Sequence, residues 1–134
     1  MKLELSSFEK ALASLDEALA EFDRTQSQFV KDACIQRFEY TYELAHKLLK
    51  RQLEAMSPNP SGIDQMSFPD MIRTGAERGL LAQSWDQWKY FRDARNATSH
   101  AYNEKKANEV FARIPGFRDE AAFLLARLQE RNAE

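Results

Sequence analysis

The sequence has little cysteine, glycine and proline, and it has no long apolar run. Cys34 is the only cysteine among 134 residues, so the chain cannot form an internal disulfide or a cysteine-based zinc site. Four glycines and four prolines are too few for a disordered or turn-rich protein. No apolar stretch suits a signal peptide or a spanning helix. We therefore expect a soluble, cytoplasmic protein that does not bind membranes.

The charge balance limits the partners that the chain can have. The formal net charge is −2, which argues against a protein that coats nucleic acid by neutralising its phosphates. Residues 85–106 depart from this balance, because they include five basic residues and three acidic ones. Basic charge therefore gathers in one segment of an acidic chain.

Helical periodicity is what the sequence has in abundance. Hydrophobic residues make up 43% of the chain and charged residues 30%, which is typical of a helical bundle. Apolar residues recur at helical intervals over residues 35–56, and the second helix should have about 28 residues. Two prolines and a glycine at 57–62 should end it. We predict an all-α fold: a single domain over residues 1–134, an antiparallel, up-and-down four-helix-type bundle with one or two short extra helices.

Local patterns predict the other helix boundaries. Ser6 has capping-box spacing to a glutamate three residues later, which predicts the start of the first helix. Ser67, Ser84 and Asn103 predict three further starts, and the helix after Ser84 should continue through residue 99. Pro115-Gly116 predicts an interruption before a last helix.

The helix after Ser84 should present two different faces. At 100° per residue, one face should pack on the bundle through Tyr90, Ala94, Ala97 and Ala101. The opposite face mixes indoles and guanidiniums and carries Trp85, Trp88, Arg92, Arg95, Asn96 and Ser99. Indoles on that side indicate a second packed surface, formed by another helix of the chain or by a dimer partner. Alternatively, the tryptophans simply cover the end of the bundle.

Arg95 and His100 are residue types that suit phosphate chemistry, but helix geometry separates them. In an unbroken helix their directions differ by about 140° and their heights by about 7.5 Å. Thr98 and Ser99 are weak helix formers that can loosen the helix, and a two-fold axis can also bring the two groups together. A cleft between them would suit cleavage of RNA without a metal, although a surface arginine and a capping histidine fit the same spacing.

Residues 95–104 read Arg-Asn-Ala-Thr-Ser-His-Ala-Tyr-Asn-Glu, and residues 35–45 read Ile-Gln-Arg-Phe-Glu-Tyr-Thr-Tyr-Glu-Leu-Ala. The first segment resembles the Arg-x4-His-x-Tyr signature of HEPN domains in the branch encoded next to minimal nucleotidyltransferases. The second resembles the long-helix motif of the same branch, whose members are commonly labelled nucleotidyltransferase substrate-binding proteins. The resemblance covers nearly the whole chain. It implies a helical bundle that forms a homodimer, with arginine and histidine of both protomers lining a shared cleft.

The resemblance also implies a function. In toxin–antitoxin members the cleft is a metal-independent ribonuclease site, carried here by Arg95 and His100 with the polar Asn96 beside them. The partner, a minimal nucleotidyltransferase encoded by a neighbouring gene, is the antitoxin and can transfer AMP to the motif tyrosine, here Tyr102. A phosphate two residues from His100 would block the cleft and repel RNA. We therefore predict an RNase toxin that AMPylation silences.

Two other functions fit the same residues. The chain could be a non-catalytic subunit that binds a substrate or nucleotide for the partner nucleotidyltransferase, or a helical dimerisation module with a degenerate site. The intact set of Arg95, His100 and Tyr102 favours the toxin. The acidic net charge favours the binding subunit, because it attracts RNA only weakly.

The long-helix motif departs from the family at His46, where a tryptophan is usual. Glu39, Glu43 and His46 share one helix face, with a spacing that superficially resembles a metal site. We favour a polar stripe that orients the cleft or the dimer, and we expect no metal and no cofactor. The predicted cleft or partner contacts are therefore Glu39, Glu43, Trp85, Trp88 and Arg92.

Overall fold

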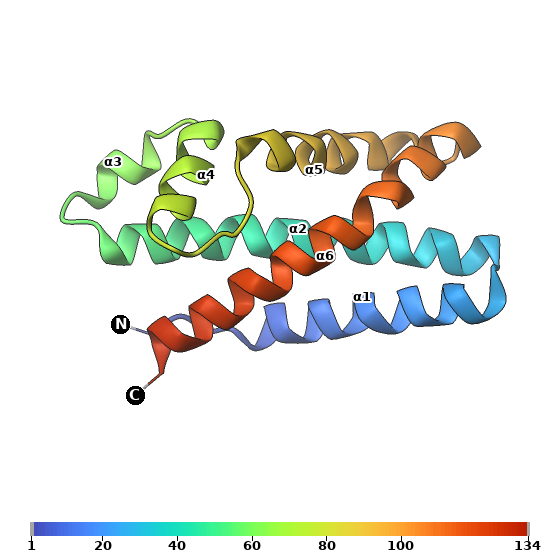
Figure 1. Ribbon diagram of the computed structural model, residues 1–134, viewed down its shortest axis with the longest axis horizontal. Coiled ribbons are helices and arrows are strands. Elements are labelled where there is room, and N and C mark those ends of the chain that lie inside the picture. The colour runs from blue at the N-terminus through green and yellow to red at the C-terminus, as the bar shows by residue number, and fades with distance from the viewer. Residues whose placement is uncertain (1, 134) are drawn as a thin grey trace.

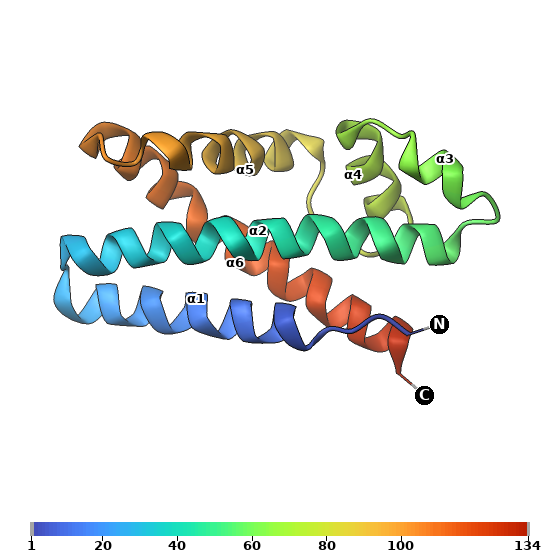
Figure 2. The ribbon, with the colours of Figure 1, turned by 180° about the vertical axis from the view of Figure 1, so that it is seen from behind.

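A computed structural model describes residues 2–133, and within that range the chain is helical and has no strand. The helices are α1 (Ser6–Thr25), α2 (Gln28–Met56), α3 (Pro60–Asp64), α4 (Phe68–Glu77), α5 (Trp85–Ala97) and α6 (Glu104–Asn132), with a 3-10 turn, η1 (Thr98–His100), before α6. The four long helices run in alternating directions, and both ends of the chain lie at the same end of the bundle (Figures 1 and 2). The predicted all-α, up-and-down fold is confirmed.

The long helix α2 lies between α1 and α5, and α6 crosses all three diagonally (Figures 1 and 2). Aromatic rings from α2, α5 and α6 meet at this crossing. The ring of Phe117 lies 5.1 Å from that of Phe38, 5.8 Å from that of Tyr42 and 6.1 Å from that of Trp88, measured between centroids. Large buried rings contribute strongly to core stability, so this contact fixes α5 against α2. Within residues 2–133, no helix has the length and apolarity needed to cross a membrane.

The predicted helix starts are correct, but the caps differ in detail. Ser67 accepts a hydrogen bond from a backbone N–H in the first turn of α4, and Asn103 accepts two from the first turn of α6. Ser84 occupies the N-cap position of α5. The predicted capping box at Ser6 is wrong, because Leu5 is the N-cap residue and its side chain makes no cap hydrogen bond. The carboxylate of Glu4 instead accepts the backbone N–H of Ser6 at 2.8 Å.

The predicted interruption at Pro115-Gly116 is also wrong. Helix α6 continues through Pro115 to Asn132, and it changes direction where its colour passes from orange to red (Figures 1 and 2). Proline removes one hydrogen bond and bends a helix, but packing on both sides can offset that cost. Ile114 and Phe117 flank the proline and are completely buried. Tertiary packing therefore keeps one helix where the local pattern predicts two.

The predicted faces of α5 are correct only in part, because Ala94 is buried and Ala97 packs against the core as predicted. The buried face consists of Trp88, Phe91 and Ala94, whereas Tyr90, expected in the core, is 44% exposed. Burying an indole and a phenyl ring removes more apolar surface from water than burying alanines does. Trp88 is completely buried by helices of its own chain, so it is neither a cleft residue nor a partner contact. Of the two explanations for the tryptophans, packing on another helix of the chain is correct for Trp88.

A buried carboxylate holds the start of α5 in place. Glu120 of α6 is only 2% exposed and accepts three hydrogen bonds: from Trp88 Nε1 at 2.7 Å, from the Gln83 N–H at 3.0 Å and from the Ala82 N–H at 3.1 Å. Buried charges persist when hydrogen bonds satisfy them. Glu120 thus joins α6, the loop before α5 and the core indole.

Candidate functional site

Of the two ways to bring Arg95 and His100 together, the helix break at Thr98-Ser99 is present, and the helix ends two residues before the predicted position. Helix α5 ends at Ala97, and residues 98–100 form the 3-10 turn η1. The backbone N–H of Ala101 donates to the Thr98 carbonyl at 3.2 Å, and that of Asn103 donates to the His100 carbonyl at 3.0 Å. These tighter turns carry the chain away from the axis of α5. His100 therefore leaves the helix that carries Arg95.

The guanidinium of Arg95 reaches across to α2. Its Nε and one terminal nitrogen both contact Oε1 of Glu43, each at 2.5 Å. The Arg95 side chain is 34% exposed and that of Glu43 is 51% exposed. An ion pair as exposed as this contributes about 1 kcal/mol or less, so a phosphate can compete for the arginine. No hydrogen bond joins Arg95 to His100 among the residues that the structure describes.

Glu39 holds the 3-10 turn to α2. The hydroxyl Oγ1 of Thr98 lies 2.6 Å from Glu39 Oε2 and 2.7 Å from the carbonyl oxygen of Arg95, and its single hydrogen can serve one of them at a time. Glu39 and Glu43 lie one turn apart on α2. Both carboxylates therefore contact the end of α5, one through the turn and one through the arginine.

His46 packs against an aromatic ring. It is half-buried, and its ring lies 4.6 Å from that of Phe68 at the start of α4. Burial holds the pKa of His46 below its ordinary value. Its neighbours on the α2 face, Glu39 and Glu43, are engaged with α5 and η1. Glu39, Glu43 and His46, whose spacing resembles a metal site, thus each contact a different partner.

Acidification should weaken the fold partly through His46. Because its pKa is lowered in the folded state, the unfolded chain binds the proton more readily, and stability is lost as pH falls below about 6.5. His46→Phe keeps a ring on Phe68 and removes the titration. When the pH is lowered from above 6.5 to below 6.5, we expect the urea midpoint of unfolding to fall less in this variant than in the wild type. Equal falls in both proteins would contradict the assignment.

His100, Tyr102 and Asn96 face solvent around the break. The rings of His100 and Tyr102 lie edge to face with centroids 6.3 Å apart, and Tyr102 is 89% exposed. Asn96 lies on the last turn of α5, where its carbonyl accepts the Ser99 hydroxyl at 3.4 Å. An enzyme or an RNA strand can thus reach the phenol and the imidazole together.

Arg92 lies over aromatic rings one turn before Arg95. Its guanidinium carbon is 5.0 Å from the centroid of Trp85 and 6.0 Å from that of Phe68. Burial raises the pKa of the Tyr42 phenol, and the positive charges of Arg92 and Arg95 both counteract that rise. The predicted site residues Trp85 and Arg92 are therefore in contact with each other, next to the pair of Arg95 and Glu43.

A small hollow adjoins the break. It lies between the first turns of α2 and the segment after α5 and is lined by Asp32, Ile35, Gln36, Glu39, Thr98, Ala101 and Tyr102. Two carboxylates and the exposed phenol thus border the same depression. The spacing of residues in the sequence did not point to Asp32 or Gln36, because they come close to Tyr102 only when α2 packs beside the turn.

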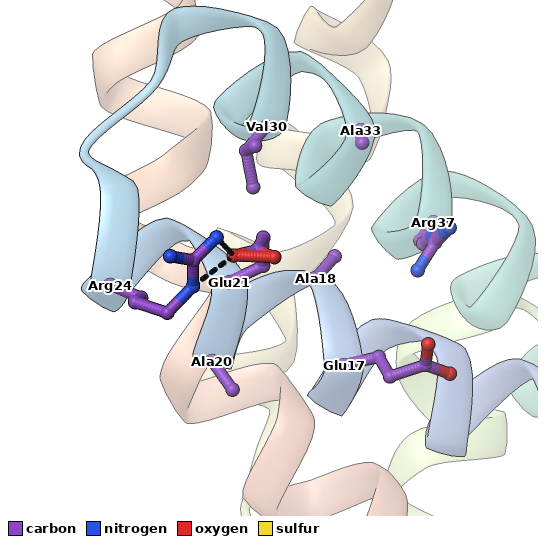
Figure 3. Close-up of a pocket in the computed structure, with 8 residues that line it drawn as sticks. All are labelled: Glu17, Ala18, Ala20, Glu21, Arg24, Val30, Ala33 and Arg37. Carbon is purple, nitrogen blue, oxygen red and sulfur yellow. Dashed lines mark hydrogen bonds and ion pairs between the residues drawn. The ribbon is translucent and has the colours of Figure 1, made fainter.

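Another hollow, shown in Figure 3, lies between α1 and α2, away from α5. Both of its arginines are engaged with protein partners. Arg24 pairs with Glu21 at 2.5 Å, and Arg37 donates to the carbonyl of Ser14 at 2.7 Å. None of the site residues predicted from the sequence lines this hollow. We therefore place the candidate site on the α5 side of α2.

Comparison with known families and proteins gives a consistent result. The family described as nucleotidyltransferase substrate binding protein like matches residues 3–130. A Haemophilus influenzae protein named "Probable ribonuclease HepT" is 42% identical over 98 residues, which is 73% of this chain. The match spans 66% of that relative's own length, slightly less than two thirds.

Two solved structures have a similar fold. The first is HI0074 from Haemophilus influenzae, described as revealing the fold of a substrate binding domain of a nucleotidyltransferase. It has a TM-score of 0.87 and 32% identity, and the match covers 94% of this chain and 99% of that one. The second, from Thermus thermophilus, has a TM-score of 0.71 and 35% identity, with 91% and 98% of the two chains covered.

Proposed function

The chain belongs to the nucleotidyltransferase substrate-binding protein-like family of HEPN domains, and from this membership we propose that it is a metal-independent ribonuclease toxin controlled by a partner nucleotidyltransferase. The observation that carries the proposal is the break after α5. It presents His100 and Tyr102 to solvent just after the helix end that carries Arg95, an arginine whose ion pair is exposed enough to exchange for phosphate. The name of the Haemophilus influenzae relative, "Probable ribonuclease HepT", supports the same activity.

The chemistry needs a proton shuttle and a positive charge. His100 accepts the proton of a 2′-hydroxyl, whose oxygen bonds to the adjacent phosphorus while the bond from phosphorus to the 5′-oxygen breaks. An imidazolium donates a proton to the leaving 5′-oxygen. The products are a 2′,3′-cyclic phosphate and a 5′-hydroxyl. Arg95 stabilises the charge that gathers on the phosphate oxygens, once the phosphate has replaced Glu43.

A second protomer is proposed to complete the cleft. Within one chain, Glu43 holds Arg95 against α2, and the His100 ring lies beside Tyr102 rather than beside the guanidinium. A two-fold axis next to the break would place two such arginines and two histidines around one phosphate. We therefore propose a homodimer whose shared cleft binds RNA.

The direct test is RNA cleavage in EDTA. Purified protein should release fragments that end in 2′,3′-cyclic phosphate, and adding Mg²⁺ should not be required. The ends can be identified by mass spectrometry, with a 2′-O-methyl RNA as the uncleavable control. The absence of fragments at high protein concentration would contradict the ribonuclease function.

Tyr102 is proposed as the residue through which the partner silences the toxin. Its phenol oxygen attacks the α-phosphate of ATP, pyrophosphate leaves, and the AMP that remains adds negative charge beside His100. Incubation with the partner nucleotidyltransferase and ATP should add AMP to the wild-type protein and none to Tyr102→Phe. Tyr90→Phe removes another exposed tyrosine and should be modified like the wild type. Modification that persists in Tyr102→Phe would exclude this site.

A non-catalytic binding subunit is the second candidate. The family description and the description of HI0074 both refer to substrate binding, and the net charge of −2 attracts RNA only weakly. Under this hypothesis the protein binds the partner and raises its transferase activity without cleaving RNA. Cleavage in EDTA that requires His100 would rule it out.

A further inference from the structure

We propose that Arg92, stacked on Trp85 and Phe68, is a second phosphate-binding group that holds the backbone of single-stranded RNA next to the phosphate bound by Arg95. The ligand is an RNA phosphodiester adjacent to the one that is cleaved. The inference depends on the RNA-binding function proposed above. It adds a residue that positions the substrate and takes no part in proton transfer.

Arg92 has no anionic partner among the residues that the structure describes. Arg95 and Arg118 are each paired with a carboxylate, whereas Arg92 contacts only ring faces. Its Nε is buried and has no hydrogen-bond acceptor, while the residue as a whole is only half-buried. Buried polar groups without partners are rare in folded proteins and often mark a function. A ligand oxygen at the terminal nitrogens would give this cation the partner that the chain does not provide.

The aromatic rings hold the guanidinium in one orientation. The Arg92 carbon lies 5.0 Å from the Trp85 centroid, and the rings of Trp85 and Phe68 are themselves edge to face at 5.8 Å. The ring of His46 also lies 4.6 Å from that of Phe68. A stacked guanidinium loses little conformational freedom when it binds, and its planar fork matches two phosphate oxygens.

Arg92 and Arg95 are aligned along α5. Three residues in a helix are separated by about 60° in direction and about 4.5 Å in height, so both side chains leave the same face. Both charges act on the phenol of Tyr42 on α2. The two guanidiniums therefore follow one line over the α2 side of the molecule, as two phosphates of a strand would require.

The accessible group above the rings is a cation, which favours the phosphate backbone of an RNA strand over a base. Proteins that bind single strands combine cations along the backbone with aromatic or guanidinium planes. Trp85 is half-buried beneath Arg92, so the accessible group here is the cation and not the indole face. We therefore assign backbone binding without a base preference.

Binding of a fluorescein-labelled, single-stranded 2′-O-methyl RNA to the full-length protein tests the proposal. Arg92→Gln should weaken binding about tenfold and lower the slope of log affinity against log salt by about 0.7, the value for one phosphate contact on a single strand. Arg92→Lys keeps the charge and should keep the slope. The probe has no free 2′-hydroxyl, so binding is measured independently of cleavage.

Arg113→Gln is the matched control. Arg113 also has no ion-pair partner within the described residues and stacks on a ring, with its guanidinium carbon 4.3 Å from the Tyr90 centroid. It lies on α6 against the opposite face of α5. Its removal should leave the salt slope of the wild type unchanged. Equal slopes of log affinity against log salt in Arg92→Gln and Arg113→Gln would overturn the proposal. Loss of the dimer in Arg92→Gln, at the same protein concentration as the wild type, would also overturn it, because Arg92 would then act on assembly and not on RNA.

The wild-type protein provides a second measurement that does not depend on how the glutamine variant folds. The NMR signal of the Arg92 Nε–H group, identified by its disappearance in Arg92→Lys, should shift when the 2′-O-methyl RNA is added. An unchanged signal at saturating RNA would overturn the proposal, as would the absence of RNA binding. If the signal shifts with ATP but not with RNA, Arg92 binds a free nucleotide, and the proposal is overturned.

Discussion

His100→Ala should lower the rate of RNA cleavage in EDTA by about 10²- to 10⁴-fold, the usual contribution of a positioned acid or base. His100 is exposed on η1, so the truncation should leave the fold intact. Arg95→Ala should lower the rate by about 10²- to 10³-fold through the loss of charge stabilisation. Initial rates on an RNA with a fluorophore and a quencher, at equal protein concentration, give both values.

The chain provides its own control for the histidine. His46 is the other of its two histidines, and it packs on Phe68 instead of facing the break. His46→Phe should therefore cleave RNA at close to the wild-type rate. Cleavage by His100→Ala at that rate would exclude His100 as the proton shuttle. His100→Ala, Arg95→Ala and His46→Phe should have the melting temperature of the wild type. A difference in cleavage rate then does not arise from unfolding.

Glu120→Ala should destabilise the fold by about 3 kcal/mol. The substitution leaves the Trp88 indole N–H without its acceptor in the core, and it frees two backbone N–H groups of the loop before α5. At about 2–5 °C per kcal/mol, the melting temperature of a chain of this size should fall by about 10 °C. Thermal unfolding followed by circular dichroism measures the change.

Two variants make the Glu120 result specific. Asp119→Ala removes the adjacent carboxylate, whose side chain is 80% exposed, and should change stability by about 0.5 kcal/mol or less. Glu120→Gln keeps the size of the side chain but places an amide donor among N–H donors, so it should remain clearly destabilised. A Glu120→Ala protein as stable as Asp119→Ala would refute the role of this carboxylate.

The sequence by itself determined most of the helices and most of their boundaries, and it offered the break in the candidate site as one of two alternatives. Periodicity over residues 35–56 predicts α2, and Ser67 and Asn103 mark helix starts because their side chains cap nearby N–H groups. Thr98-Ser99 allows a break for a similarly local reason, although the pattern after Ser84 predicts a helix through residue 99 and α5 ends at Ala97. Each of these features depends on residues within one or two turns of each other, and such features can be inferred from the residue order.

The tertiary structure alone decided which groups meet. Trp88 is in the core because α6 supplies both an apolar surface and the Glu120 acceptor, and Pro115 stays within a helix because its neighbours are buried. Glu43, the partner of Arg95, comes from α2, and Phe68, one of the two rings under Arg92, comes from α4; both are distant from α5 in the sequence. A side chain chooses its partner by the free energy of packing and desolvation after distant helices come together. That choice depends on the packed arrangement of the helices and cannot be read from spacing along one of them.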